Sequence, residues 1–294
     1  MNLYTHQDRN ILKTWLFVTM FFVLVILLGW MISYYYDNPA ILYSAFFLAL
    51  FLNIFSYWFS DKIVLKLHKA KLVARQDFFD LWNITENLSI AAGLPMPKLY
   101  VIDDLAPNAF ATGRNKKHAV VCVTTGLLNL LDKNELEGVI AHELSHIGNR
   151  DMLLSTIVVV MAGFVALLSD MFMRSQFWGS RDRNHAGGGA LLIVGLALAI
   201  LAPLAATLIR LAISRKREFL ADASGALLTR YPTGLANALL KISQTGQPLK
   251  TANNASAHLF ISSPFGNLKT SKFHDLFLTH PPVAERINAL LGHQ

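Results

Sequence analysis

Four long runs of apolar residues alternate with mixed, more polar segments along this chain. The runs cover residues Trp15–Tyr36, Pro39–Ser60, Met152–Met173 and Ala186–Ile209. Each run reaches the roughly 20 residues that an α-helix needs to cross the hydrocarbon core of a bilayer. The hydrophobic pattern therefore predicts about four transmembrane helices, grouped into two hairpins.

The first run is expected to stay in the mature chain as a membrane anchor. Its last residues, Ser33–Asp37, offer no small-residue cleavage site for a signal peptidase. The connector Asp37–Pro39 carries no basic residue, whereas Arg9 and Lys13 precede the run. Because basic residues stay on the cytoplasmic side, the amino terminus and the segment after Ser60 are predicted to be cytoplasmic.

The loop between the third and fourth runs leaves their arrangement open. Arg174, Arg181 and Arg183 outnumber Asp182 in this loop, so the charge rule favours the cytoplasmic side for the loop as well. That preference conflicts with a hairpin that crosses the membrane twice. Two interpretations remain, in which these runs either span the bilayer or do not.

The segment between the two pairs of runs mixes helical and strand patterns. Apolar spacing over Asp61–Ala92 predicts one amphipathic helix that ends at Gly93, and Lys98–Ile102 is typical of a strand. Residues Asn108–Gly113 and His118–Thr124 predict a β-hairpin directly before the next helix.

This predicted hairpin has two interpretations. An extended edge at Asn108, Ala109 and Phe110 is suited to hold a peptide as one more strand of the sheet. A hairpin with a purely structural role explains the same residues. The sequence pattern is compatible with both.

The residues after the fourth run predict a second polar part of the chain. Lys216–Leu228 and Gly234–Ser243 have helical patterns, and Thr279–Leu290 predicts a helix started by proline. Residues 244–268 are rich in Asn, Ser, Gly and Pro and predict a mobile loop. The chain is thus expected to divide into a hairpin, a polar part, a second hairpin and a second polar part, over residues 1–61, 62–151, 152–213 and 214–294.

The composition agrees with a membrane protein. Hydrophobic residues make up 53 % of the 294 residues and charged residues only 15 %, which is too apolar for an ordinary soluble domain. The net charge of +7 does not indicate nucleic-acid binding, because the basic residues cluster beside the apolar runs, where they meet anionic lipid headgroups. The single cysteine, Cys122, rules out an intrachain disulfide framework and is expected in a buried strand.

The clearest chemical signal is the spacing His-Glu-x-x-His within a predicted helix that starts with a capping-box pattern at Asp132 and Glu135. On such a helix His142 and His146 lie on one face and can present ring nitrogens to one metal ion, with Glu143 beside them. This donor set suits a catalytic zinc site with Glu143 as the general base. Two solvated surface histidines are the alternative interpretation.

A catalytic zinc site needs a third protein ligand, and Glu218 is the candidate. Glu218 and Asp222 lie at i and i+4 of a predicted helix, so Asp222 can accept the second ring N–H of a histidine ligand. The alternative is a juxtamembrane helix with solvated charges. His280 is a candidate donor to the developing oxyanion and Arg286 a candidate support for it, although His280 also suits a cap before the turn at Pro281.

These features resemble the HtpX-type membrane zinc metallopeptidases of the gluzincin group, which includes the CAAX prenyl proteases. The resemblance rests on four segments, in the family's order among four apolar runs: Asn108–Gly113, His142–His146, Arg217–Asp222 and His280–Arg286. It spans nearly the whole chain. It implies an α+β fold, namely a mostly helical zincin-like metalloprotease domain with a small β-sheet, attached to about four transmembrane helices.

The resemblance also implies one zinc ion per subunit, held by His142, His146 and Glu218. Glu143 would be the base and Asp222 would support a ligand. The implied protein is an endopeptidase in a bacterial inner membrane, with a cytoplasmic catalytic domain, that cleaves misfolded or damaged membrane proteins under stress. Two other functions compete: a proteolytically idle membrane scaffold with structural zinc, which has no use for a base, and a metal transporter, which needs more ionisable residues inside the spans than Asp170.

The positions of the proposed ligands restrict the path of the chain. His146 precedes the third run by six residues and Glu218 follows the fourth by nine, yet both must reach one ion. The runs between them must therefore cross the membrane an even number of times or not at all. At about 1.5 Å per helical residue, zinc is expected roughly 10 Å from the hydrocarbon edge, so substrates would be cut close to the membrane surface, in juxtamembrane or extracted unfolded segments.

Overall fold

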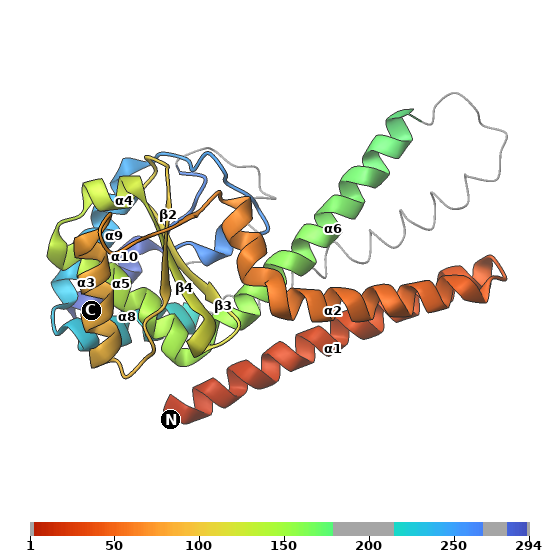
Figure 1. Ribbon diagram of the computed structural model, residues 1–294, viewed down its shortest axis with the longest axis horizontal. Helices are drawn as coiled ribbons and strands as arrows, with labels where there is room; N and C mark the ends of the chain where they lie inside the picture. Colours follow the sequence, from red (N-terminus) through yellow and green to blue (C-terminus); the bar gives the residue numbers. More distant parts are fainter. Residues whose placement is uncertain (1–2, 179–214, 267–280, 293–294) are drawn as a thin grey trace.

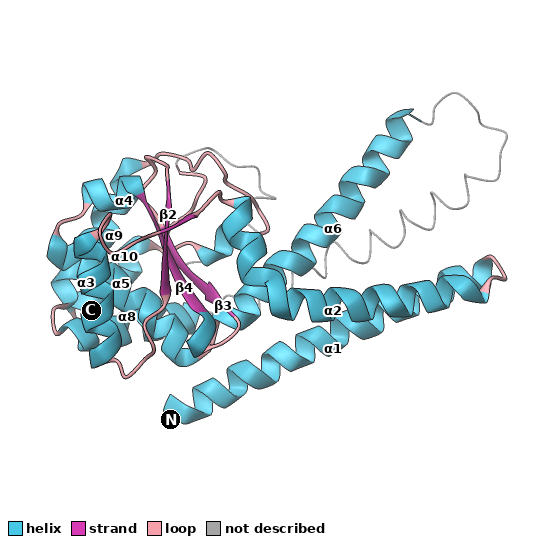
Figure 2. Ribbon diagram, in the orientation of Figure 1, coloured by secondary structure: helices cyan, strands magenta, loops and turns pink. Residues whose placement is uncertain are grey.

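Two long helices, α1 (Leu3–Tyr35) and α2 (Pro39–Leu67), form a hairpin that extends from the rest of the molecule (Figure 1). The computed structural model describes residues 3–178, 215–266 and 281–292. Helices dominate these residues, and one small sheet lies within the part opposite the hairpin (Figure 2). The expected α+β fold with a small sheet is therefore confirmed.

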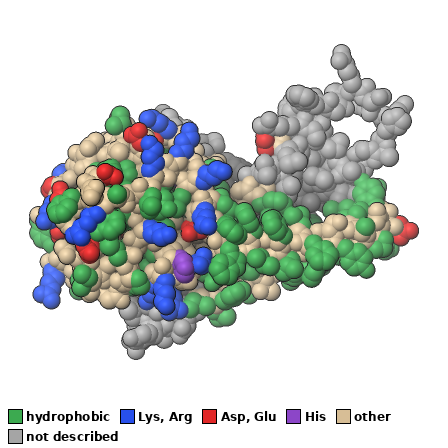
Figure 3. Space-filling view, viewed as in Figure 1, with side chains coloured by type: hydrophobic (Ala, Val, Ile, Leu, Met, Phe, Trp, Pro, Cys, Tyr) green, Lys and Arg blue, Asp and Glu red, His purple; other side chains and the backbone are tan. Residues whose placement is uncertain are grey.

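The hairpin has the features of a membrane-spanning pair. Asn38 caps α2 by accepting a hydrogen bond from the N–H of Ala40, and Pro39 occupies the first turn, where its missing N–H is not needed. Large side chains stay exposed to the surroundings, for example Phe47 at 65 % and Phe51 at 59 %. Figure 3 shows apolar side chains covering the hairpin on one face, and a bilayer is the solvent that such a surface requires.

Two of the four predicted spans are confirmed as long apolar helices. Within the described residues, Thr14–Tyr35 and Pro39–Leu67 are each long and apolar enough to cross a bilayer. The third run lies in α6 (Met152–Trp178), which becomes a third candidate span when taken with the preceding helix, from which it bends by 87°. The fourth run, residues 186–209, lies outside the described residues.

The sheet has four strands in the order β1-β2-β4-β3. Their bounds are β1 Lys71–Leu72, β2 Lys98–Ile102, β3 Ala109–Gly113 and β4 Ala119–Thr124. Strands β3 and β4 form the predicted antiparallel hairpin, whereas β2 and β4 run parallel. Gly113 ends β3 at φ +136°, and a Cβ there would meet the carbonyl oxygen of His118, so the turn needs glycine. Because β3 is the last strand in the order given above, it lies at the edge of the sheet.

The prediction of one helix over Asp61–Ala92 is wrong. Helix α2 ends at Leu67, the chain turns through Lys69 at φ +53°, and α3 begins only at Phe79. The residues between them include β1, which pairs with Tyr100 and Val101 of β2. Pairing with a distant strand thus replaces the helix that the local apolar spacing favours.

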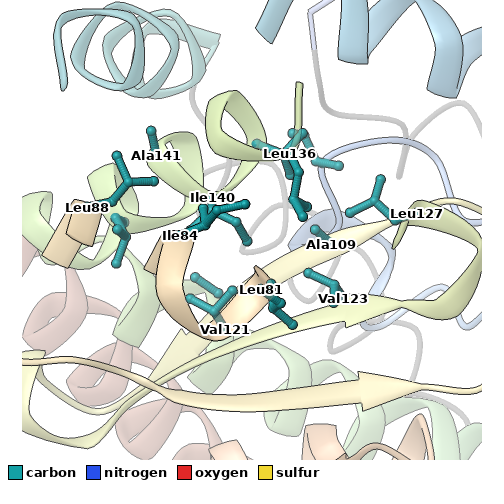
Figure 4. Packing of buried hydrophobic residues seen from close by; sticks show 14 of the residues in the cluster. Leu81, Ile84, Leu88, Ala109, Val121, Val123, Leu127, Leu136, Ile140 and Ala141 are labelled. Atoms are coloured by element: carbon teal, nitrogen blue, oxygen red, sulfur yellow. The ribbon is translucent and has the colours of Figure 1, made fainter. Parts of the chain in front are cut away.

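Helix α5 (Lys133–Asn149) is the centre of the helical layer. It packs against α3 (Phe79–Ala91), α8 (Arg215–Thr229) and α9 (Pro232–Thr245). Figure 4 shows the core between α3, α5 and the sheet, where Leu81, Ile84 and Leu88 meet Val121, Val123 and Ile140. The short α4 (Thr125–Leu130), α10 (Val283–Leu291), η1 (Lys116–His118) and η2 (Ala257–Leu259) complete the described elements.

The predicted loop after α9 packs against the protein in the part that the structure describes. Phe260 and Ile261 are buried, and the N–H of Ile261 donates to the carbonyl oxygen of Ala109 on β3 at 2.9 Å. His68 directly follows the end of α2. Its Nδ1 forms a hydrogen bond with the hydroxyl of Thr251, and its Nε2 forms one with the hydroxyl of Ser256, at 2.9 Å each. This loop is thus held between the hairpin and the edge strand.

Candidate active site

Helix α5 carries His142, Glu143 and His146, and specific local structure defines where this helix begins and ends. At its start Asp132 and Glu135 form the predicted capping box, each accepting the other's backbone N–H at 3.0 Å. At its end Arg150 adopts a left-handed conformation, φ +56°, that turns the chain into α6. The apolar face of α5 lies in the core, so His142 and Glu143 are both only 1 % exposed.

The structure brings three of the candidate side chains, those of His142, His146 and Glu218, to one point. The Nε2 atoms of His142 and His146 lie 3.1 Å apart. The Glu218 carboxylate lies 3.9 Å from the first of these nitrogens and 3.7 Å from the second. Donors that share one zinc ion at about 2.0–2.2 Å lie about 3.3–3.6 Å from one another, so this set of two imidazoles and a carboxylate fits a zinc site.

Helix α8 carries Glu218 to this point through an unusually close approach to α5. A Cβ added at Gly225 would lie 2.9 Å from the backbone nitrogen of His142, so only glycine allows the two helices to pack at this distance. Glu218 is 6 % exposed and Asp222, one turn later, is 2 % exposed. Both acidic side chains therefore point into the protein rather than to solvent.

Each histidine has its own carboxylate on the other ring nitrogen. Nδ1 of His142 lies 2.9 Å from Asp222, and Nδ1 of His146 lies 3.1 Å from Asp151. Such partners fix the tautomer that leaves Nε2 for a metal ion. Sequence reasoning missed Asp151, because it follows the end of α5 and no helical spacing connects it with His146.

The two histidines differ in their electrostatic surroundings. Burial lowers the pKa of His142, which keeps that ring neutral. Burial also acts on His146, but the Asp151 carboxylate overcomes it and raises the pKa of His146 to about 10. A metal ion at Nε2 of His146 would therefore compete with a proton for this ring.

Glu143 lines the same cavity but is not one of the three side chains that could hold a metal ion. Burial raises the pKa of Glu143 to about 7, against the opposing charge of His146. A carboxyl group with this pKa can both accept and return a proton near neutral pH. The backbone of Ala111 on the edge strand hydrogen-bonds to Glu143, which connects the acid to that strand.

Arg286 lies behind the ligands. It is 1 % exposed, and its Nε and Nη2 donate to the two oxygens of Asp222 at 2.8 and 2.7 Å. Its Nη1 donates to the carbonyl oxygen of Ile261 at 3.2 Å and lies 3.9 Å from Glu218. Burial raises the pKa of Asp222, but the hydrogen bonds from Arg286 and His142 outweigh this and lower it. These contacts hold Asp222 as an anion beside His142.

A small cavity of about 40 Å³ lies next to the three converging side chains. It is large enough for at least one water molecule. Its walls include the predicted residues Glu143 and Glu218, and also Arg217, His258 and Phe260, which sequence reasoning did not assign to the site. No local signal marks His258 or Phe260, because only the folded loop brings them here.

The predicted edge residues have distinct environments. Asn108 is tied to the loop, since its Nδ2 donates to the carbonyl oxygen of Ser262 at 2.9 Å. Phe110 is fully buried and packs against the rings of His68 and Phe260. Ala109 already accepts the hydrogen bond from the loop. His280 lies outside the described residues.

Fold and site together define a membrane metallopeptidase. Two histidines of one helix and a glutamate of a second surround one point, with a buried acid and a sheet edge beside them. The chain belongs to peptidase family M48, whose family model matches residues 75–294. The expected HtpX-type metalloendopeptidase is thereby confirmed.

Individual relatives agree with this assignment. The chain is 47 % identical to a protease HtpX homolog of Caldanaerobacter subterraneus subsp. tengcongensis, over 98 % of this chain and 97 % of that relative. It is 51 % identical to a protease HtpX homolog of Pyrococcus furiosus over 84 % of each chain. The crystal structure of S. mikatae Ste24p has the same fold with a TM-score of 0.51 and 19 % identity, covering 95 % of this chain and 67 % of Ste24p.

Proposed function

We propose that this protein is a zinc-dependent endopeptidase whose metal ligands are His142, His146 and Glu218. The observation that carries the proposal is the convergence of two Nε2 atoms and one carboxylate within 3.9 Å, next to a buried acid that is not itself a ligand. When bound, zinc lowers the pKa of water towards about 7 and polarises a carbonyl group.

The protein's own groups supply proton transfer and orientation. Glu143 takes a proton from the attacking water and returns it to the leaving amine, as its pKa of about 7 allows. Asp222 and Asp151 hold the two histidine rings with Nε2 towards the ligand point. Arg286 is a positioning residue that keeps Asp222 charged. His280 remains our candidate donor to the oxyanion.

The substrate is proposed to pair with the edge strand β3. Ala109 and Ala111 are two residues apart, so both direct their backbone groups to the same side of the strand. Ile261 already bonds Ala109, whereas Ala111 lies beside Glu143 and lines the cavity. We therefore infer that the peptide bond to be cleaved lies next to Ala111. Going from the edge strand into the site, the substrate would then meet Glu143 and after it the metal ligands.

The cellular setting is proposed from the sequence and the position of the hairpin. We infer a multi-pass protein of a bacterial inner membrane whose catalytic part, residues 62–151 with 214–294, faces the cytoplasm. Its substrates would be misfolded or damaged membrane proteins, cut near the membrane surface during stress. Asp151, which orients His146, directly precedes the first residue of α6, Met152, and this closeness supports cleavage near the membrane.

Replacement of Glu143 by glutamine tests the proposal. The purified, detergent-solubilised protein is assayed for zinc content and for casein cleavage. The proposal predicts unchanged zinc and a fall in cleavage of about 10²–10⁴-fold, because the change removes the acid–base group but no ligand. Glu137→Gln, on the same helix, is the matched control. Casein cleavage that survives in Glu143→Gln would support the alternative of a scaffold with structural zinc and a contaminating protease.

A further inference from the structure

A second, larger cleft opens where the hairpin meets the rest of the protein. It has a volume of about 510 Å³, within the range of roughly 300–1,000 Å³ that is usual for ligand sites. None of its lining residues is a metal ligand. Its walls come from α1, α2, the turn between β3 and β4 and the junction of α5 with α6.

The mouth of this cleft is strongly basic. Arg114, Lys116, Lys117 and Arg150 line it, and no carboxylate among the side chains that the structure describes forms an ion pair with any of them. Burial, together with the charge of Arg150, lowers the pKa of Lys116. Four neighbouring cations that pair with no carboxylate of the described residues repel one another, and a bound anion would relieve this repulsion. Figure 3 shows Lys and Arg side chains along the border with the apolar hairpin on one face.

The floor of the cleft is apolar and leads into the hairpin. A slot of about 240 Å³ continues between α1, α2 and α6, lined by Val18, Ile54, Trp58 and Ile157 among others. The two spaces are continuous because they share wall residues, namely Thr14, Trp15, Tyr57 and Leu153. The combined space is therefore basic at one end and hydrocarbon-like at the other.

The boundary between the two ends lies at the depth of a membrane interface. Trp15 stands at the start of the first span, Thr14–Tyr35, and Tyr57 faces it from α2; both residue types favour the headgroup level of a bilayer. The Arg114 guanidinium lies 4.6 Å from the centre of the Trp58 ring, which directs its charge to this level. Basic pockets beside transmembrane helices are known to bind anionic lipid headgroups.

We propose that this cleft binds one anionic phospholipid, with its phosphate at Arg114 and Lys116 and one acyl chain in the slot between α1, α2 and α6. The bound lipid would touch both the hairpin and Arg150, the residue before the histidine partner Asp151. It would therefore fix the catalytic part against the membrane. This proposal does not depend on the proteolytic mechanism, since none of the residues involved acts in catalysis.

Native mass spectrometry of the full-length protein in detergent tests the proposal. The protein is titrated with phosphatidylglycerol and with phosphatidylcholine of identical acyl chains. We expect phosphatidylglycerol to bind at least about tenfold more tightly, because two or more basic residues contact its phosphate without a competing choline. The double variant Arg114→Ala/Lys116→Ala should lower this affinity about tenfold and remove the preference between the two lipids.

Two further variants distinguish binding at this site from the effects of overall charge and of overall hydrophobicity. Lys66→Ala/Lys71→Ala removes two exposed basic residues near the membrane that do not line the cleft, and should change neither affinity by more than about twofold. Val18→Phe should narrow the slot and lower the affinity of the protein for both lipids. Unchanged zinc content shows that each variant is folded.

Several results would overturn the proposal. Equal binding of the two lipids by the unaltered protein would remove the anionic preference. Equal losses of phosphatidylglycerol affinity in Arg114→Ala/Lys116→Ala and in Lys66→Ala/Lys71→Ala would show that only the overall charge of the protein matters. Displacement of phosphatidylglycerol by inorganic phosphate at the same concentration would show that the slot does not hold an acyl chain.

Discussion

Replacing Arg286 by methionine separates the two roles considered for this residue. The guanidinium is 1 % exposed and donates two hydrogen bonds to Asp222, at 2.8 and 2.7 Å, and one to Ile261 at 3.2 Å. Removal of one partner of a buried ion pair costs about 3–5 kcal/mol, because the other charge stays buried without compensation. For a catalytic part of this size, the unfolding temperature of the zinc-free protein should fall on the order of 10 °C.

The same change should weaken zinc binding at the proposed metal site. Asp222 orients His142, and loss of such a partner lowers metal affinity about 10–100-fold. Thermal unfolding with and without zinc, together with zinc competition against a chromophoric chelator, measures both effects. Arg75→Met is the matched control, since the Arg75–Glu86 pair, 3.5 Å apart, is 55 % and 38 % exposed, and such pairs contribute about 1 kcal/mol or less. Normal stability and zinc affinity with a reduced kcat in Arg286→Met would refute the positioning role and favour direct contact with the oxyanion.

Three other outcomes follow from the structure. Asp151→Asn should lower zinc affinity about 10–100-fold in the same competition assay, because His146 loses its carboxylate; an unchanged affinity would contradict this role. Burial lowers the pKa of His68 to about 4, so its stabilising contribution is complete above pH 6.5 and declines by about 3 kcal/mol as the pH falls to 4. The protection of residues 249–261 against hydrogen exchange, measured relative to the intrinsic exchange rate at each pH, should fall over that pH range because His68 holds them through Ser256, whereas in His68→Gln it should not change with pH. Chelators should abolish cleavage, and zinc should restore it.

The residues of the site that were predictable from the sequence are those placed by local geometry. His142 and His146 are neighbours on any α-helix, and the capping box at Asp132 makes the helix itself predictable. Glu218 and Asp222 follow the same i, i+4 rule. The strands β3 and β4 were predictable because their hairpin is short in sequence. In each case the information lies within a few residues.

The features that the sequence did not reveal depend on contacts between distant segments. Strand β1 forms only because β2 offers it a partner, although the apolar spacing of its own residues favours a helix. The packing of Phe260 at the cavity depends on His68 and Phe110, which are far away in the chain. The position of Arg286 behind Asp222 depends on how α10 docks on α8. A local pattern cannot encode such long-range pairings.

The split ligand set connects metal binding with the assembly of the catalytic part. His142 and His146 precede residues 152–213, Glu218 follows them, and yet its carboxylate lies within 3.9 Å of both Nε2 atoms. The intervening chain must therefore begin and end on the same side of the bilayer, whatever path it takes. Because a metal ion at this point would bind α5 and α8 at once, its binding energy also stabilises the contact between these two helices. Binding of a metal ion and the packing of the two polar parts of the chain against each other would thus be one coupled equilibrium.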